Sequence, residues 1–95
     1  MSGLTEAPVR VRVVVTGVVQ GVWFRDSCRE QARKLHVGGW VRNRSDGAVE
    51  GEFEGSAVAV DRLVDWCHTG PARARVDGVE VAMVPTSGDQ RFRVL

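Results

Sequence analysis

The sequence lacks any apolar run long enough to cross a lipid bilayer, so no membrane-spanning helix is predicted. It also lacks a dominant charge, because 13 basic side chains are interleaved with 12 acidic ones and the formal net charge is only +1. Such a surface gives no broad electrostatic attraction for nucleic acid or for a membrane, and neither is expected as a partner. The first eight residues contain no apolar stretch of the signal-peptide type, and a cytoplasmic location is the resulting expectation.

Cysteine is scarce as well. The two that occur, Cys28 and Cys67, are far apart and have no metal-ligand spacing, so they predict no metal site. Both fall at apolar positions of predicted helices, which favours buried, inert thiols, while a disulfide between them stays an open alternative. The 95 residues include no low-complexity segment or internal linker. We therefore expect a loose lead-in over residues 1–8 and a single domain over residues 9–95.

Hydrophobic periodicity predicts a mixture of strands and helices. Valines alternate with other residues from Val9 to Thr16, which is the period of a strand. From Phe24 to Leu35 the apolar residues recur at helical spacing, opposite a charged face. Asp46-Gly47 is a strong hairpin signal. The predicted elements are strands at residues 9–16, 40–43, 48–54, 79–83 and 92–94, and helices at residues 24–35 and between Ser56 and Gly70.

The order of these elements is βαββαβ followed by a short fifth strand, which predicts an α+β fold, the ferredoxin-like α/β sandwich. Two right-handed crossovers place the first and third strands side by side in an antiparallel four-stranded sheet, with both helices on one face. No apolar stripe is evident outside the predicted core, so a monomer is expected.

The most informative segment is GVVQGVWFR, residues 17–25, in which a valine-rich strand meets a helix through a turn with two glycines. The first N–H groups of a helix have no partner within it, and the helix dipole adds partial positive charge, so the turn is a predicted anion-binding site. Arg25 adds a guanidinium, which suits a phosphoryl group. A second segment, Gly39–Asn43, puts a neutral carboxamide at the end of another strand. Together they indicate an enzyme for small phosphorylated substrates.

GVVQGVWFR resembles the phosphate-loop signature of the acylphosphatase family, and GGWVRNRSDGAVEGEFEG resembles the second signature of that family at the matching separation. The resemblance reaches Trp66-Cys67, Gly70-Pro71 and the final Phe92-Arg93-Val94, and so covers nearly the whole chain. Two motifs at the right spacing are far more specific than a lone glycine-rich loop. The resemblance implies hydrolysis of acyl phosphates to a carboxylate and inorganic phosphate, with no metal and no cofactor.

By position, the resemblance makes Arg25 the residue that binds the substrate phosphate and Asn43 the residue that positions the attacking water. It assigns the N–H groups that wrap the phosphoryl oxygens to the loop residues Val19, Gln20, Gly21, Val22, Trp23 and Phe24. Trp23 has two alternatives, packing or partial exposure with contact to the acyl portion. His36 stands where relatives often have glycine, so a left-handed histidine is expected just past the first helix.

The predicted fold hosts unrelated activities, so other functions need consideration. An RNA-binding module would carry stacking aromatic residues on its first and third strands, and the first predicted strand here has none. A soft-metal carrier would place a cysteine pair in the first strand-to-helix loop, which contains no cysteine. The remaining alternative is a regulatory domain that binds an anion or an acyl phosphate without hydrolysing it.

Overall fold

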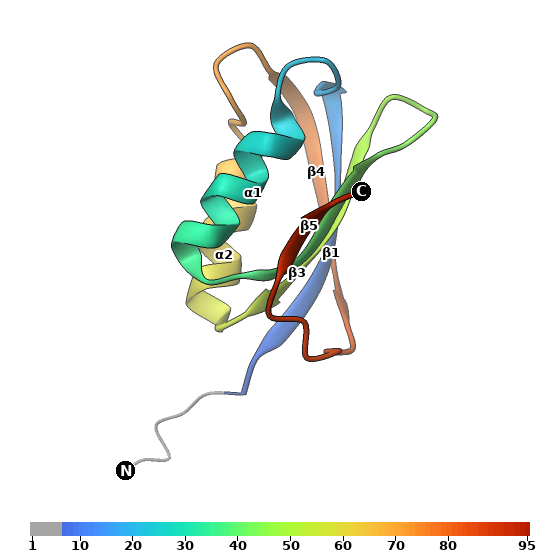
Figure 1. Cartoon of the computed structure of the whole chain (residues 1–95). Helices are drawn as coiled ribbons and strands as arrows, with labels where there is room; N and C mark the ends of the chain where they lie inside the picture. The colour runs from blue at the N-terminus through green and yellow to red at the C-terminus, as the bar shows by residue number, and fades with distance from the viewer. Residues whose placement is uncertain (1–6) are drawn as a thin grey trace.

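The computed structural model describes residues 7–95, which form two helices and five strands (Figure 1). These elements are β1 (Val9–Val18), α1 (Phe24–Leu35), β2 (Gly38–Asn43), β3 (Val49–Gly55), α2 (Ala57–Cys67), β4 (Arg75–Val84) and β5 (Phe92–Val94). Most of the predicted lead-in, residues 1–6, lies outside the described residues. Within residues 7–95 neither helix has the length and apolar character needed to span a membrane.

All five strands belong to one sheet, in the order β4-β1-β3-β2-β5. β1 pairs antiparallel with both β3 and β4, and β2 pairs antiparallel with β3. β5 is parallel to β2 and forms one edge. Figure 1 shows α1 and α2 together on one face of the sheet. The predicted ferredoxin-like architecture and the predicted neighbours β1 and β3 are therefore confirmed.

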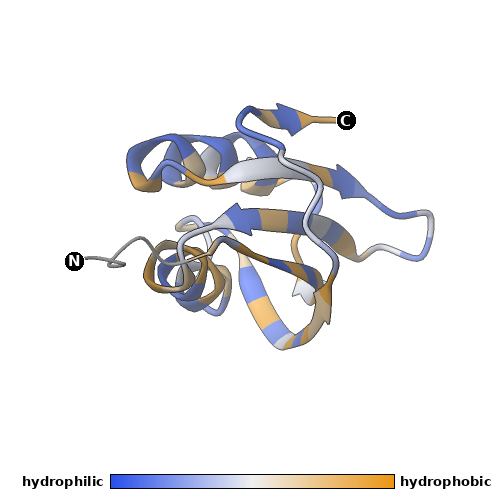
Figure 2. Cartoon of the chain, turned by 90° about the horizontal axis from the view of Figure 1, so that it is seen from below, coloured by the Kyte–Doolittle hydropathy of each residue, from blue (hydrophilic) through white to orange (hydrophobic). Residues whose placement is uncertain are grey.

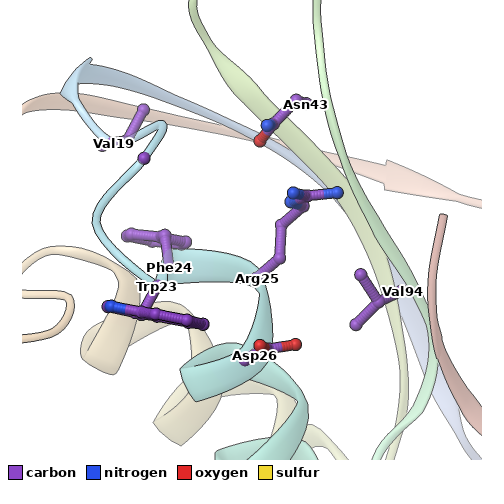
Figure 3. Close-up of a pocket in the computed structure, with 8 residues that line it drawn as sticks. Val19, Trp23, Phe24, Arg25, Asp26, Asn43 and Val94 are labelled. Atoms are coloured by element: carbon purple, nitrogen blue, oxygen red, sulfur yellow. The ribbon is translucent and has the colours of Figure 1, made fainter.

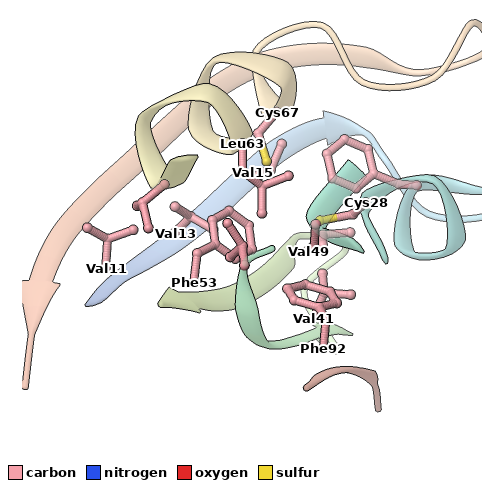
Figure 4. Close-up of a cluster of buried hydrophobic side chains, with 14 of the residues drawn as sticks. Val11, Val13, Val15, Cys28, Val41, Val49, Phe53, Leu63, Cys67 and Phe92 are labelled. Carbon is pink, nitrogen blue, oxygen red and sulfur yellow. The ribbon is translucent and has the colours of Figure 1, made fainter. Parts of the chain in front are cut away.

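The alternation along β1 builds the floor of the core. Val11, Val13 and Val15 are buried under the helices, whereas Arg12 and Thr16 on the opposite face are exposed. Figure 2 shows this alternation as bands of hydrophilic and hydrophobic colour along the strands. Further large core residues from β2, β3, α2 and β5 surround the same space (Figure 4): Val41, Val49, Phe53, Leu63 and Phe92.

The two cysteines lie in this core. Cys28 of α1 and Cys67 of α2 are both fully buried and both free, which confirms the prediction of buried thiols and leaves the two residues without a disulfide. A hydrogen bond with the Cys67 thiol, together with burial, raises the pKa of Cys28 well above its ordinary value. A neutral thiol in an apolar interior is chemically inert.

The strand β2 begins two residues earlier than predicted. The strand begins at Gly38 rather than at residue 40, because Gly38 and Gly39 are themselves part of it. Gly39 has φ +127°, and a Cβ atom there would overlap the main-chain oxygen of Glu52 on β3. The glycine therefore permits a close approach of two paired strands, and it does not end a strand.

β4 differs from its prediction in length and in burial. It begins at Arg75 instead of residue 79. Val81 and Met83 pair with buried valines of β1 and so face the helix side of the sheet. The second helix packs on β1 and β3, however, and leaves this edge uncovered. The side chains of Val81 and Met83 are accordingly 47% and 74% exposed.

The face of the sheet opposite the helices is covered by paired charges. The carboxylate of Glu50 accepts from the guanidinium of Arg12 on β1 and from that of Arg42 on β2. Burial by itself raises the pKa of Glu50, but the two arginines outweigh it and the net pKa lies below its ordinary value. The strands of this face are thereby linked by side chains as well as by main-chain hydrogen bonds.

A second charged cluster holds the connection between β4 and β5. Glu54 accepts from the main-chain N–H groups of Ser87 and Gly88, each at 2.8 Å, and from the Arg10 guanidinium at 2.8 Å. Burial raises the pKa of Glu54, but these three donors together lower it below its ordinary value. Glu54 thus orders the loop that leads into β5.

Candidate active site

The connection between β1 and α1 runs over residues 19–23 and lies within the first motif, residues 17–25. Gly17, with φ +127°, precedes it, and a Cβ at this position would overlap the main-chain oxygen of Arg75 on β4. Gly21 has φ +75°, but a Cβ there would meet no protein atom within 4 Å. The first glycine is therefore required by strand packing, whereas the second faces open space and supplies a left-handed turn.

The first turn of α1 presents unpaired N–H groups. Trp23 is the N-cap residue, and its carbonyl accepts the first helical hydrogen bond from Ser27 N at 3.0 Å. The Trp23 side chain makes no capping hydrogen bond, so the N–H groups of the following turn have no partner within the helix. Phe24 anchors this turn, because its buried ring packs on Trp66 of α2 with the ring centroids 5.2 Å apart.

Arg25, in the first turn of α1, is half-buried and extends toward β2 (Figure 3). Its Nη1 atom donates to the main-chain oxygen of Leu95, just past β5, at 3.2 Å. This contact leaves the other guanidinium N–H groups available to a ligand. The helix fixes the position of the Arg25 backbone, and the hydrogen bond to Leu95 orients its guanidinium.

Asn43, the last residue of β2, pairs with Val49 in the hairpin with β3. Its carboxamide points toward the guanidinium of Arg25 (Figure 3). The Oδ1 atom of Asn43 is buried and accepts no hydrogen bond, and it is the one side-chain atom within residues 7–95 in that condition. Buried polar atoms are nearly always paired, so an unpaired acceptor beside a cation marks a place where a ligand or a water molecule binds.

These residues line one hollow of about 300 Å³, which we call the Arg25 hollow. Figure 3 shows the loop on the left, Asn43 above the guanidinium of Arg25, and Trp23 below the loop. The lining residues are Val19, Gly21, Trp23, Phe24, Arg25, Asp26, Asn43 and Val94. All the residues predicted for the site are thus brought together here except Gln20 and Val22.

The side chains of those two residues make contacts elsewhere, and the prediction for their main-chain N–H groups stays a prediction. Val22 is partly buried against the core. The Nε2 atom of Gln20 donates to the main-chain oxygens of Arg44, at 2.7 Å, and of Ala48, at 3.0 Å. Gln20 therefore ties the loop to the hairpin that follows Asn43, and its side chain is a link between the two motifs.

Sequence reasoning missed two lining residues, Asp26 and Val94. Asp26 directly follows Arg25, and an acidic residue in a first helical turn is usually explained by the helix dipole, so it gave no functional signal. Val94 comes from the far end of the chain and reaches the hollow only because β5 pairs with β2. No local pattern could place it there.

The other charges near the hollow are already paired. Arg42 bonds to Glu50, and Arg44 bonds to Asp46 at 2.8 Å, so neither arginine adds much free positive charge to the site. The hydrogen bond from Ala48 N, followed by that from Arg44, lowers the pKa of Asp46. Among residues 7–95, no group of three or more His, Cys, Asp or Glu side chains is arranged to hold a metal ion.

Comparison with known proteins gives one consistent result. The family model for acylphosphatase matches residues 11–94. The acylphosphatase of Rubrobacter xylanophilus is 65% identical over 82 residues, which are 86% of this chain and 74% of that protein. The solved acylphosphatase of Coxiella burnetii superposes with a TM-score of 0.89 at 36% identity and covers 93% of both chains. That of Bacillus subtilis gives a TM-score of 0.89 at 34% identity, over 92% of this chain and 98% of its own.

Proposed function

The chain belongs to the acylphosphatase family, and we propose that its hydrolysis of acyl phosphates takes place in the Arg25 hollow by in-line attack of water on phosphorus. The observation that carries this proposal is the Oδ1 atom of Asn43, a buried acceptor without a partner on a residue that lines the same hollow as Arg25. A water bound to that oxygen would lie close to a phosphoryl group held by the guanidinium.

The phosphoryl group would be held by main-chain N–H groups and by Arg25. The first turn of α1 and the loop residues Val19, Gly21 and Trp23 line the hollow, their main-chain N–H groups would bind the phosphoryl oxygens, and the helix dipole favours an anion there. Arg25 supplies the formal positive charge that partly offsets the substrate dianion. Donors fixed in advance toward the phosphoryl oxygens stabilise the transition state without reorganisation.

Asn43 would orient the nucleophile. Its carbonyl oxygen accepts a hydrogen bond from water, and its amide can donate to a phosphoryl oxygen. A carboxamide is too weak a base to take a proton, so we propose that the proton passes to a phosphoryl oxygen of the substrate. Asn43 thus contributes by position, which is the main requirement in phosphoryl transfer.

The chemistry needs little more than this. In the reaction R–CO–O–PO₃²⁻ + H₂O → R–COO⁻ + H₂PO₄⁻, a bond forms between phosphorus and the water oxygen while the bond between phosphorus and the bridging oxygen breaks. The leaving group is a carboxylate whose conjugate acid has a pKa of about 4, so it departs at neutral pH without a general acid.

Alanine variants of the two side chains test these roles. Arg25→Ala should lower kcat/KM for benzoyl phosphate by about 100-fold or more and should weaken inhibition by inorganic phosphate, because one oriented, charged donor is lost. Asn43→Ala should lower kcat and leave inhibition by phosphate near normal, because only the water loses its acceptor. Arg29→Ala is the matched control, since Arg29 lies one turn further along α1 and does not line the hollow. Near-normal turnover in either site variant would remove the role proposed for that residue.

Isotope transfer tests the bond that is attacked. Hydrolysis of benzoyl phosphate in water enriched in oxygen-18 should put the label into phosphate and none into benzoate. Label in benzoate would show attack on the carbonyl carbon and would overturn the in-line mechanism. Turnover should persist in excess chelator, because Arg25 and the loop amides already offset the phosphoryl charge.

We also propose that residues 9–95 act as one domain and as a monomer in the cytoplasm, without nucleic acid or a membrane as partner. The near-balance of 13 basic and 12 acidic side chains supports this proposal, as do the two free thiols, which suit a reducing compartment. Light scattering of the eluted protein should give the mass of a single chain, and a dimer mass would refute the monomer.

A further inference from the structure

Trp23 is the large apolar residue of the Arg25 hollow that neither the phosphoryl group nor the core accounts for. Its side chain is 72% exposed, whereas Val19 and Phe24 beside it are buried. Within residues 7–95 the paired rings are Phe24 with Trp66 and Phe53 with Phe92, so Trp23 stacks on none of them. We propose that the indole of Trp23 is a platform for the acyl group of the substrate and gives the enzyme a preference for neutral aromatic acyl phosphates. This inference rests on the in-line mechanism proposed above.

Local folding does not explain a tryptophan at this position. Trp23 is the N-cap of α1, where Ser, Thr, Asp, Asn and Gly are favoured, and its side chain makes no capping hydrogen bond. Its backbone is left-handed, with φ +66°, a conformation that costs energy for every residue with a Cβ atom. Strained residues of this kind gather at sites of function. A tryptophan here is therefore unfavourable for the stability of the fold in three ways: it caps the helix poorly, its backbone is left-handed, and its indole is exposed to water.

The direction of the reaction brings the acyl group to Trp23. In an in-line displacement the leaving group departs from the side of phosphorus opposite the attacking water. Asn43, which would hold that water, lies above the Arg25 guanidinium in Figure 3, and Trp23 lies below the loop on the side of Arg25 away from Asn43. A phosphoryl group bound at Arg25 with its water at Asn43 therefore points its carboxyl leaving group toward the indole.

The neighbours of Trp23 restrict which acyl groups fit. Asp26 lines the same hollow, and its side chain is 54% exposed with its nearest cation, Arg29, at 3.8 Å. A second negative charge on the acyl group would meet this carboxylate. A flat apolar group can instead stack on the indole, which offers a large contact area at little cost in side-chain entropy. The ratio of kcat/KM for benzoyl phosphate to that for acetyl phosphate should accordingly exceed the ratio of their rates of uncatalysed hydrolysis.

Four variants assayed on both substrates separate this role from a structural one. Trp23→Gly removes the indole and also suits the left-handed backbone, Trp23→Ala removes the indole alone, and Trp23→Phe keeps an aromatic ring. Met83→Ala on β4 is the control, because Met83 is equally exposed at 74% and does not line the hollow. We expect the ratio of kcat/KM for benzoyl phosphate to that for acetyl phosphate to fall about tenfold in the Gly and Ala variants. The ratio should be largely kept in Trp23→Phe and unchanged in Met83→Ala, while inhibition by inorganic phosphate stays constant throughout.

A binding measurement distinguishes failure of this inference from failure of the proposed mechanism. Benzoylmethylphosphonate and acetylmethylphosphonate carry a methylene in place of the bridging oxygen and cannot be hydrolysed at that bond. Calorimetry should show tighter binding of the benzoyl compound to the wild type, and Trp23→Gly should lose that advantage. Normal turnover with an unchanged ratio in Trp23→Gly, or an equal loss on both substrates, would overturn the platform and leave the mechanism standing. Absence of turnover in the wild type, with the binding preference still dependent on Trp23, would overturn the mechanism alone.

Discussion

Replacement of Gln20 tests whether the two motifs form one rigid unit. The Nε2 atom of Gln20 donates one hydrogen to the oxygen of Arg44 and the other to the oxygen of Ala48. Arg44 directly follows Asn43, so this amide joins the phosphate loop to the strand end that carries the proposed water-binding residue. Gln20→Ala removes both hydrogen bonds, and Gln20→Glu keeps the shape but turns one carboxylate oxygen toward both carbonyl oxygens.

The size of the effect follows from the number of bonds and from their partners. Each hydrogen bond between neutral groups contributes about 1 kcal/mol, so Gln20→Ala should lower the free energy of unfolding by about 2 kcal/mol. Both carbonyls keep another donor, since Arg44 N bonds to Ala48 O and Gly47 N bonds to Arg44 O, and this limits the loss. In a domain of this size the corresponding fall in Tm is about 10 °C. The Tm of Gln20→Glu should fall further, because the carboxylate would repel the carbonyl oxygens of Arg44 and Ala48.

We expect Gln20→Ala to lower kcat as well as the free energy of unfolding. A shift of about 1 Å between the phosphate loop and Asn43 can lower the rate by on the order of 100-fold, so we expect kcat for benzoyl phosphate to fall at least about tenfold in Gln20→Ala. Thermal unfolding by circular dichroism and steady-state hydrolysis measure the two effects. Gln90→Ala serves as control, because Gln90 is an exposed glutamine on the loop before β5. If Gln20→Glu matched the wild type in both Tm and kcat, the hydrogen bonds of Gln20 would contribute neither to stability nor to catalysis.

The remaining predictions concern stability. His36→Gly should raise Tm by about 4 °C, because His36 has φ +58° at the end of α1 and glycine removes the left-handed penalty; the control His68→Gly, at a right-handed φ of −67°, should bring no gain. Glu54→Gln should lower the free energy of unfolding by about 2 kcal/mol at neutral pH, because a buried pair with Arg10 is broken. Since the pKa of Glu54 is lowered in the fold, its contribution is complete above the unfolded pKa of about 4.3 and is lost as the pH falls toward the folded value. Acid unfolding of Glu54→Gln should thus depend less steeply on pH below about 4.3, and an unchanged slope would contradict that assignment.

Much of the fold follows from patterns over a few residues. The valines of β1 alternate because a strand has a period of two, and the helix from Phe24 to Leu35 has the predicted bounds. The second helix lies between Ser56 and Gly70 as predicted, and the side chain of Ser56 caps it by accepting from Ala59 N. The left-handed histidine past the first helix was also predicted correctly. These features depend on local backbone preferences and on the burial of one face, both of which can be read from neighbouring residues.

The errors come from positions where long-range packing overrides the local pattern. Gly38 and Gly39 resemble a break in the sequence, but the neighbouring chains require glycine within the strand. Val81 and Met83 alternate like buried residues, but they remain exposed because the helices do not reach that edge. Neither outcome can be obtained from the residues of β2 or β4 alone.

The sequence by itself determined which chemical groups the site contains, because the glycines, the arginine and the asparagine occur in two motifs of fixed spacing. Only the tertiary structure decided how they meet, because the unpaired oxygen of Asn43, the wall provided by Val94 and the link through Gln20 each join segments far apart along the chain. Short-range preferences fix strands, helices and turns, whereas the distances between them depend on how the side chains of the whole core pack together.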